Sequence, residues 1–405
     1  MDEKTILLKG GNIVSEIGVI PGGYLLIKGQ KISSLGEAGV AVTADETIDV
    51  SGKTVVPGFI DMHTHGMMDV DFMESDVPAT MRGFEYYAAF GVTRLVASTL
   101  SNPMETIISQ AKRIRQAGEE SVIGDILHGV HVEGPWLAPR CRGGHALEYL
   151  KKPEKMDVER LLGEAGDIVK TVTYAPELDN SVWLTEQLAD YGIVPVLGHT
   201  EASYEDAEKV IRAGARHVTH MYDTTMGYKE NPDEALVMLP GMETAVLYHN
   251  QVSIELIGCP VHVPKPFFKF IDKVKPWDKK VIVTDCLVGT GRPDGTVLTY
   301  KDGRKVYVEE GVLRMIDDDP AVNGNLTGSA VTINRAFKRL CEYAELPIHE
   351  AVRWVSYNPA ATLGIQNETG SLRAGKFADI VIMDDQFNVE MTLLKGKTIF
   401  QGGVL

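Results

Sequence analysis

Histidine and carboxylate residues close several short hydrophobic segments of this chain. They are His63 and His65 in VVPGFIDMHTHG, Glu133 in HGVHVEGP, His199 in VPVLGHT, His220 in RHVTHMY and Asp285 in KKVIVTD. Side chains alternate along a strand, so the spacing of two places His63 and His65 on one face. Imidazole and carboxylate groups suit Zn, Fe, Co or Mn, whereas a soft site would need cysteine thiolates. The set therefore predicts a metal centre with open positions for water and substrate.

The strength of this prediction lies in the set and not in any single member. A lone histidine at a strand end is more often hydrogen-bonded in the core or at the surface, and a lone Asp there is often a helix cap. We expect such ordinary roles for the remaining histidines of similar segments, namely His128, His131, His217 and His249. The full set predicts one or two divalent ions per chain, with Zn as the first expectation and Fe, Co or Mn as alternatives.

Alternating strand and helix patterns must position these residues. Strand-like segments at 93–100, 125–134, 171–177, 194–200, 217–222 and 279–285 alternate with helix-like segments such as 103–120, 181–192 and 204–215. Repeated units of this length indicate a parallel sheet, and their number favours a closed (β/α)8 barrel over an open doubly wound sheet. No GxGxxG motif follows the first strand, which argues against dinucleotide binding. In such a barrel the active site lies where the strands end.

Both ends of the chain are rich in short strand-like runs punctuated by glycine, including 5–14, 23–36 and 375–385. This pattern is typical of hairpins. We expect one small β-sandwich domain formed by residues 1–54 and 365–405, and a barrel domain formed by residues 55–364.

Composition limits the class of partner. The chain has 405 residues, 44% of them hydrophobic, and its 40 basic against 56 acidic residues give a net charge of −16. This balance argues against nucleic acid or an anionic membrane surface as a partner, but it leaves an anionic small substrate open. The four cysteines form no CxxC pair, and no segment is typical of a signal peptide or a membrane span. We expect a cytoplasmic protein.

Several longer stretches, in order along nearly the whole chain, resemble the amidohydrolase superfamily and, more narrowly, the N-acetylglucosamine-6-phosphate deacetylases. They are VVPGFIDMHTHG, HVEGPWLAPRCRGGH, LGHTEASYEDAEKVIRAGARHVTHMYD, VIVTD, GNLTGS and AGKFADIVIMD. The resemblance implies the same barrel with a small β-sandwich, a small N-acetylated substrate and a homodimer.

The resemblance also implies a role for each site residue. Glu133, His199 and His220 would hold the principal metal, and His63 and His65 match a second position that only some members fill. Two matches concern catalysis and one concerns substrate binding: Asp285 as the catalytic carboxylate, His145 as the group that polarises the amide carbonyl, and His262 at the substrate end of the pocket. Asp285 would act as general base and then as general acid beside metal-activated water.

The substrate half of the pocket departs from the family pattern. An Asn-Ala pair is replaced by Asp223 and Thr224, and the loop that follows has no Arg, with Lys229 as its one cation. An Asp facing a phosphate is repulsive, and Lys lacks the bidentate geometry of Arg. An Asp-Gly pair before His262 is replaced by Cys259 and Pro260, and proline removes a backbone donor. These departures leave open another N-acetylated amino sugar, with or without phosphate, or another small N-acyl compound as substrate.

Two rival hypotheses follow from the same residues. Cyclic-amide hydrolases of the superfamily bridge two metals with a carboxylated lysine, but here the motif supplies Glu133, and Lys170 stands at the start of its strand. A non-catalytic scaffold on this fold should have lost ligands or the catalytic carboxylate, and this chain retains them.

Overall fold

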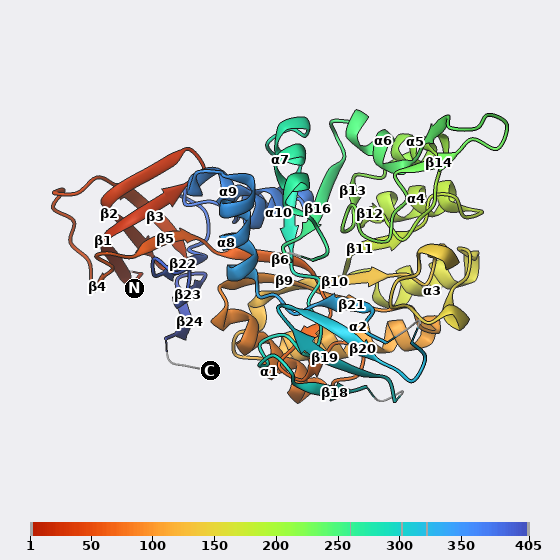
Figure 1. Ribbon diagram of the computed structural model, residues 1–405. Coiled ribbons are helices and arrows are strands. Elements are labelled where there is room, and N and C mark those ends of the chain that lie inside the picture. The colour runs from red at the N-terminus through yellow and green to blue at the C-terminus, as the bar shows by residue number, and fades with distance from the viewer. Residues whose placement is uncertain (1–2, 260, 301–302, 321–322, 403–405) are drawn as a thin grey trace.

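The centre of the fold is a sheet of eight parallel strands that forms a nearly closed barrel in the computed structural model (Figure 1). The structure describes residues 3–259, 261–300, 303–320 and 323–402, without the side chains of Lys229 and Glu230. The prediction of a (β/α)8 barrel is confirmed. In spatial order the strands are β6 (Phe59–Thr64), β9 (Val92–Thr99), β10 (Leu127–Glu133), β11 (Val169–Tyr174), β12 (Val194–Leu197), β13 (His217–Val218), β16 (Ser253–Ile257) and β17 (Lys280–Val283).

The barrel is closed between β17 and β6 by contacts just beyond the regular strands. The backbone N–H of Asp285 donates to the carbonyl of His63 at 2.9 Å. The hydroxyl of Thr284 donates to the buried carboxylate of Asp61 at 2.6 Å. Closure of the barrel therefore brings Asp285, the last of the candidate site residues along the chain, beside His63 and His65.

Helices surround the barrel because each buries one apolar face. In α2, for example, Ile107, Ile108 and Ile114 are buried while the opposite face is charged. The helices are α1 (Val77–Ala89), α2 (Met104–Glu120), α3 (Lys155–Ala165), α4 (Ser181–Asp190), α5 (Tyr204–Ala213), α6 (Met242–Tyr248), α7 (Lys265–Val274), α8 (Ile333–Ala344), α9 (Ile348–Val355) and α10 (Tyr357–Thr362). Among the described residues, none of these helices has both the length and the apolar character needed to cross a bilayer.

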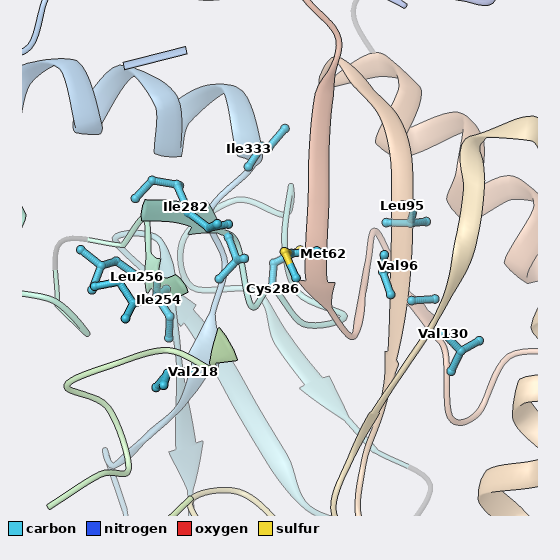
Figure 2. Packing of buried hydrophobic residues seen from close by; sticks show 14 of the residues in the cluster. Met62, Leu95, Val96, Val130, Val218, Ile254, Leu256, Ile282, Cys286 and Ile333 are labelled. Carbon is cyan, nitrogen blue, oxygen red and sulfur yellow. The ribbon is translucent and has the colours of Figure 1, made fainter. Parts of the chain in front are cut away.

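The barrel strands are buried on both faces, as parallel strands covered by helices must be. Figure 2 shows Leu95 and Val96 on β9 and Ile254 and Leu256 on β16, all within one cluster of buried hydrophobic residues. Dense packing of this kind fixes the strands, and so it fixes the polar residues that follow them.

The two ends of the chain meet in one eight-stranded sheet beside the barrel, as expected (Figure 1). Its strands are β1 (Thr5–Ser15), β2 (Gly18–Lys28), β3 (Lys31–Gly36), β4 (Glu46–Asp49), β5 (Thr54–Pro57), β22 (Ile380–Met383), β23 (Val389–Leu394) and β24 (Lys397–Gln401). The chain passes from β5 of this sheet directly into β6 of the barrel. The domain limits at 54–55 and 364–365 stay predictions.

A second small sheet was not predicted. Four antiparallel strands follow β17, namely β18 (Val297–Thr299), β19 (Lys305–Glu309), β20 (Val312–Ile316) and β21 (Leu326–Ser329). Two short pairs also lie outside the barrel, β7 (Gly66–Met67) with β8 (Val70–Asp71) and β14 (Tyr228–Glu230) with β15 (Met238–Pro240). The four-stranded sheet contributes residues to the pocket described below.

A buried ion pair ties the small terminal sheet to the barrel. Arg94 on β9 lies 2.9 Å from Asp379, which precedes β22, and the side chains are only 7% and 1% exposed. The same carboxylate accepts the hydroxyl of Thr369 at 2.6 Å and the backbone N–H of Lys395 at 2.8 Å.

We predict that Asp379→Ala lowers the free energy of unfolding by ~3–5 kcal/mol, because it leaves the Arg94 charge buried without a partner. Urea unfolding followed by circular dichroism measures the change. Glu46→Gln is the control, since its pair with Lys4 is solvent-exposed and should contribute no more than ~1 kcal/mol. Equal losses in the two variants would contradict this assignment.

Candidate active site

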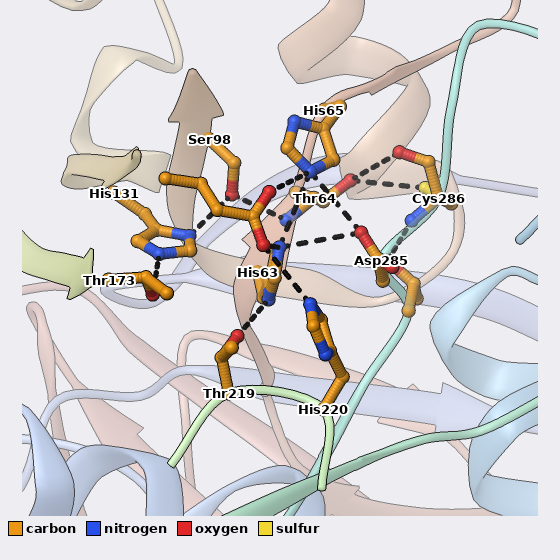
Figure 3. A network of polar contacts seen from close by, with 12 residues as sticks. His63, Thr64, His65, Ser98, His131, Thr173, Thr219, His220, Asp285 and Cys286 are labelled. Atoms are coloured by element: carbon orange, nitrogen blue, oxygen red, sulfur yellow. Dashed lines mark hydrogen bonds and ion pairs between the residues drawn. The ribbon is translucent and has the colours of Figure 1, made fainter. Parts of the chain in front are cut away.

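The carboxylate of Glu133, at the end of β10, is the centre of the candidate site (Figure 3 shows its surroundings). Its Oε1 lies 3.1 Å from Nε2 of both His199 and His220, and its Oε2 lies 3.2 Å from Nε2 of His65. His63 Nε2 is 3.4 Å from Oε1. All five side chains are buried.

Asp285 completes the cluster from the end of β17. Its Oδ1 lies 3.4 Å from Nε2 of His63 and 3.2 Å from Nε2 of His65. Groups of three ligand atoms within 4.8 Å of one another are found in three sets among the described residues: His63, His220 and Asp285; His63, His65 and Glu133; and Glu133, His145 and His199. The structure thus brings together all six residues that the sequence selected as ligands or catalytic carboxylate. Buried nitrogen and oxygen donors without thiolates fit a divalent ion such as Zn, Fe, Co or Mn.

Two of these residues adopt a backbone conformation that non-glycine residues rarely use. The φ angles of His199 and Asp285 are 50° and 46°. Such left-handed residues persist where the surrounding structure holds them, and they concentrate at functional sites. Here both follow a barrel strand, and the turn directs their side chains toward Glu133.

Hydrogen bonds at Nδ1 orient His199 and His220, the two histidines nearest to Glu133. His199 Nδ1–H donates to the carbonyl of Cys141 at 2.7 Å, and His220 Nδ1–H donates to the carbonyl of Asp223 at 3.2 Å. In the neutral ring the proton then lies on Nδ1 and the lone pair of Nε2 faces the cluster, as metal ligation requires. Asp223 therefore contributes its main chain to the site.

His145 differs from the other histidines of the site. The backbone N–H of Ser101 donates to its Nδ1 at 3.1 Å, so the neutral ring carries its proton on Nε2, which lies 3.4 Å from Glu133 Oε2. Burial lowers the pKa of His145 to about 4, and the nearby Glu133 only partly opposes this. A neutral ring with an Nε2–H in the pocket is a hydrogen-bond donor for a substrate. The Ser101 hydroxyl also lies 2.8 Å from Nδ1. Ser101 was not selected from the sequence, because nothing in its spacing from His145 along the chain indicates this contact.

The electrostatics of the cluster favour positive charge among the imidazoles. Burial by itself would lower the pKa of His65 and His220, but their contacts with Glu133 and Asp285 raise it to about 9 in each case. Burial opposes the charge of Glu133, yet His63 and the other histidines hold its pKa well below the usual range. A cation bound here would stabilise the ionised carboxylates in the same way as the positively charged imidazoles.

A cavity of about 130 Å³ opens over the cluster. Its walls include Asp223, Thr224 and His262, three of the predicted substrate residues, and the glycine pair before His145. The other departures from the family pattern are the loop that carries Lys229 and the pair Cys259 and Pro260. The side chain of Lys229 and the whole of Pro260 lie outside the described residues.

The four-stranded sheet supplies a cation that sequence reasoning missed. Among the described residues lining the cavity, Arg304 is the one Lys or Arg. Its guanidinium lies 5.3 Å from the ring centroid of Tyr300, and its Nη1–H donates to the carbonyl of Gly144 at 3.4 Å. It lies next to β19, on a segment that the sequence pattern did not place near the barrel.

Lys170 and His131 are hydrogen-bonded to groups that are not candidate ligands. Lys170, at the start of β11, donates to the carbonyl of Asp167 at 2.8 Å, at the opposite end of the strand from the cluster, which argues against a carboxylated-lysine site. His131 is hydrogen-bonded to Ser98 at 3.0 Å and to Thr173 at 2.8 Å inside the barrel (Figure 3), in agreement with the ordinary role expected for it.

A parallel (β/α)8 barrel whose strand ends carry histidines and carboxylates around one buried centre is the architecture of a metal-dependent hydrolase. Residues 54–399 match the amidohydrolase family, and the chain belongs to this family.

Relatives and solved structures narrow the comparison. An N-acetylglucosamine-6-phosphate deacetylase of Vibrio furnissii is 28% identical, over 88% of this chain and 85% of the relative. An N-acetylgalactosamine-6-phosphate deacetylase of Escherichia coli O157:H7 is 26% identical, over 97% and 99%. The crystal structure of N-acetyl-D-glucosamine-6-phosphate deacetylase from Mycobacterium smegmatis is 29% identical, covers 98% of this chain and 100% of its own, and superposes with a TM-score of 0.85.

The tautomers distinguish the candidate ligands His199 and His220 from His145, and this distinction is testable. We predict that Glu133→Ala lowers metal affinity by more than the roughly 10–100-fold typical of lost outer-shell partners, whereas His145→Ala retains the metal. Elemental analysis after equilibration with Zn²⁺ measures both. Glu243→Gln is a control for substitution of a half-buried carboxylate, since Glu243 bonds Thr225 outside the cluster. Loss of metal from His145→Ala would contradict the assignment.

Proposed function

We propose that this chain is a metal-dependent deacetylase of N-acetylated amino sugars, with N-acetylhexosamine 6-phosphates as the first substrates to test. The observation that carries the proposal is the meeting of three different groups in one pocket: a Glu133-centred ligand set, the ionised carboxylate of Asp285 and the neutral donor His145. The relatives named above support the choice of substrate, since their names specify the 6-phosphates of N-acetylglucosamine and N-acetylgalactosamine.

Two groups of residues would bind metal at two neighbouring positions. Glu133, His199 and His220 would hold a principal ion, and His63 and His65 would serve a second position, with Zn as the first candidate. A divalent ion at this place supplies Lewis acidity toward an amide carbonyl and toward water.

Asp285 and His145 would carry out the proton transfers and the hydrogen bonding. Burial opposes the charge of Asp285, but His63 and His65 lower its pKa below the ordinary value. The ionised carboxylate would accept a proton from attacking water and return it to the leaving amine. The Nε2–H of His145 would donate to the carbonyl oxygen as negative charge develops there.

Arg304 is a cation in the cavity lining that would attract an anionic group of the substrate. Asp223 also lines the cavity, where its charge would repel a phosphate. Arg304 offers a planar, permanently charged donor. The second candidate function, hydrolysis of an unphosphorylated N-acyl substrate, draws its support from Asp223 and Thr224 in place of the Asn-Ala pair.

Direct assay of acetate release tests the function. We expect hydrolysis of N-acetylglucosamine 6-phosphate or N-acetylgalactosamine 6-phosphate, and a kcat lower by ~10²–10⁴-fold in Asp285→Asn, the range for lost general acid–base catalysis. The unphosphorylated sugars are assayed in parallel, and faster turnover of these would favour the second candidate. Metal-loaded protein that releases no acetate from any of the four sugars would refute the proposal.

Arg304 has its own prediction. In Arg304→Ala, KM for the phosphorylated sugar should rise ~10–100-fold, since a hydrogen bond to a charged group contributes about 1.5–3 kcal/mol. The unphosphorylated sugar should show no such change. Arg292→Ala is the matched control, because Arg292 pairs with Asp69 and does not line the cavity. Equal effects on both sugars would contradict an anion-binding role.

We also propose a cytoplasmic homodimer. The β14–β15 hairpin exposes a run of apolar side chains, of which Leu236 and Met238 are 102% and 54% exposed. Contiguous apolar surface of this kind commonly marks a protein interface. The acidic composition and the scattered cysteines support the location.

A further inference from the structure

A buried carboxylate outside the pocket, Glu255, lies directly behind the candidate metal ligands. It stands in the middle of β16 and is 2% exposed. Its Oε1 accepts hydrogen bonds from His63 Nδ1–H at 2.6 Å, from the Thr219 hydroxyl at 2.6 Å and from the backbone N–H of His220 at 2.9 Å. Its Oε2 accepts from His217 Nε2–H at 3.1 Å. Both oxygens are therefore engaged, and neither lines the cavity.

These hydrogen bonds determine the tautomer and the ring orientation of His63. Because Glu255 accepts at Nδ1, the neutral ring of His63 carries its proton on that nitrogen, and the Nε2 lone pair faces Glu133 and Asp285, each 3.4 Å away. Thr219 adds a second restraint: its hydroxyl donates to Glu255, and its oxygen lies 3.0 Å from His63 Nδ1 (Figure 3). The ring is thus held in one tautomer and one orientation.

His220 touches the same carboxylate in a different way. Only its backbone N–H reaches Glu255, while its ring is oriented by the carbonyl of Asp223. His199 is oriented by Cys141 and has no recorded bond to Glu255 among the described residues. Removing the Glu255 charge should therefore disturb His63 far more than the ligands of the principal position.

We propose that Glu255 is a positioning residue that makes His63 a metal ligand and so controls binding of the second ion, while the principal ion depends on other partners. This inference rests on the proposed metal centre but not on the identity of the substrate. Histidine ligands commonly donate their other nitrogen to a carboxylate, and loss of that partner costs about 10–100-fold in metal affinity.

Metal titration of the full-length chain tests the proposal, with Mn²⁺ as the probe. We expect the parent protein to bind two ions at saturation and Glu255→Gln to bind the second ion ~10–100-fold more weakly, with the first unchanged. Equilibrium dialysis with elemental analysis gives the stoichiometry. Electron paramagnetic resonance adds a spectroscopic signature, since the spin-coupled pair should be replaced by an uncoupled single-ion signal.

His217→Gln is the matched control, because it alters the other end of the Glu255 network without touching a candidate ligand. It should bind two ions like the parent. Three results would overturn the proposal: unchanged second-ion affinity in Glu255→Gln, loss of both ions in that variant, or a parent protein that binds a single ion at saturation.

A double-mutant cycle separates positioning from general damage. His63→Gln alone should weaken the second ion, and adding Glu255→Gln should weaken it no further, since both changes remove one ligand. Additive losses would overturn the proposal.

If Glu255→Gln fails to fold, Thr219→Val removes the hydroxyl restraint on His63 Nδ1 and should give a smaller loss of second-ion affinity in the same direction. Deacetylase failure with intact two-ion binding would refute the proposed function and leave this inference standing.

Discussion

Buried negative charge at the mouth of the barrel is the constraint on which the rest of the site depends. Glu133 and Glu255 are each 2% exposed, and the side chain of Asp285 is 15% exposed. Burying an ionised carboxylate costs several kcal/mol unless opposite charges and donors surround it. The histidines supply those donors and hold the pKa of Glu133 and Glu255 well below the usual range, although burial opposes this. A divalent ion satisfies the same requirement with more charge in less space.

The barrel meets this requirement by collecting side chains from distant parts of the chain at its strand ends. Glu133 ends β10, while His199 and Asp285 follow β12 and β17 in left-handed turns with φ of 50° and 46°. Closure through the Asp285 N–H and the His63 carbonyl joins the two ends of the ligand set. The densely packed core beneath holds the strands in place. The packing of the barrel therefore offsets the conformational strain at these turns.

The sequence predicts those site residues that directly follow a recognisable strand pattern. A ligand directly after an apolar strand run, as in the segments of Glu133 and His199, identifies both the strand and the edge it faces. Glu255 escaped notice because it interrupts the short run SIELI, where a charged residue argues against a buried strand. Ser101 contacts Nδ1 of His145 through both its backbone N–H and its hydroxyl, and Arg304 lines the cavity from a separate sheet. Neither contact has a signature in residue spacing.

The roles proposed for the histidines follow from what each Nδ1 contacts, and residue type alone does not reveal them. A carbonyl acceptor at Nδ1 turns the Nε2 lone pair of His199 toward the cluster, and the carboxylate of Glu255 does the same for His63 while adding charge. A backbone donor at Nδ1 reverses the tautomer, which makes His145 a donor in the pocket. His65 has no recorded Nδ1 partner among the described residues. The same side chain is thus suited to metal ligation or to hydrogen-bond donation according to the neighbours of its Nδ1, and the fold sets those neighbours.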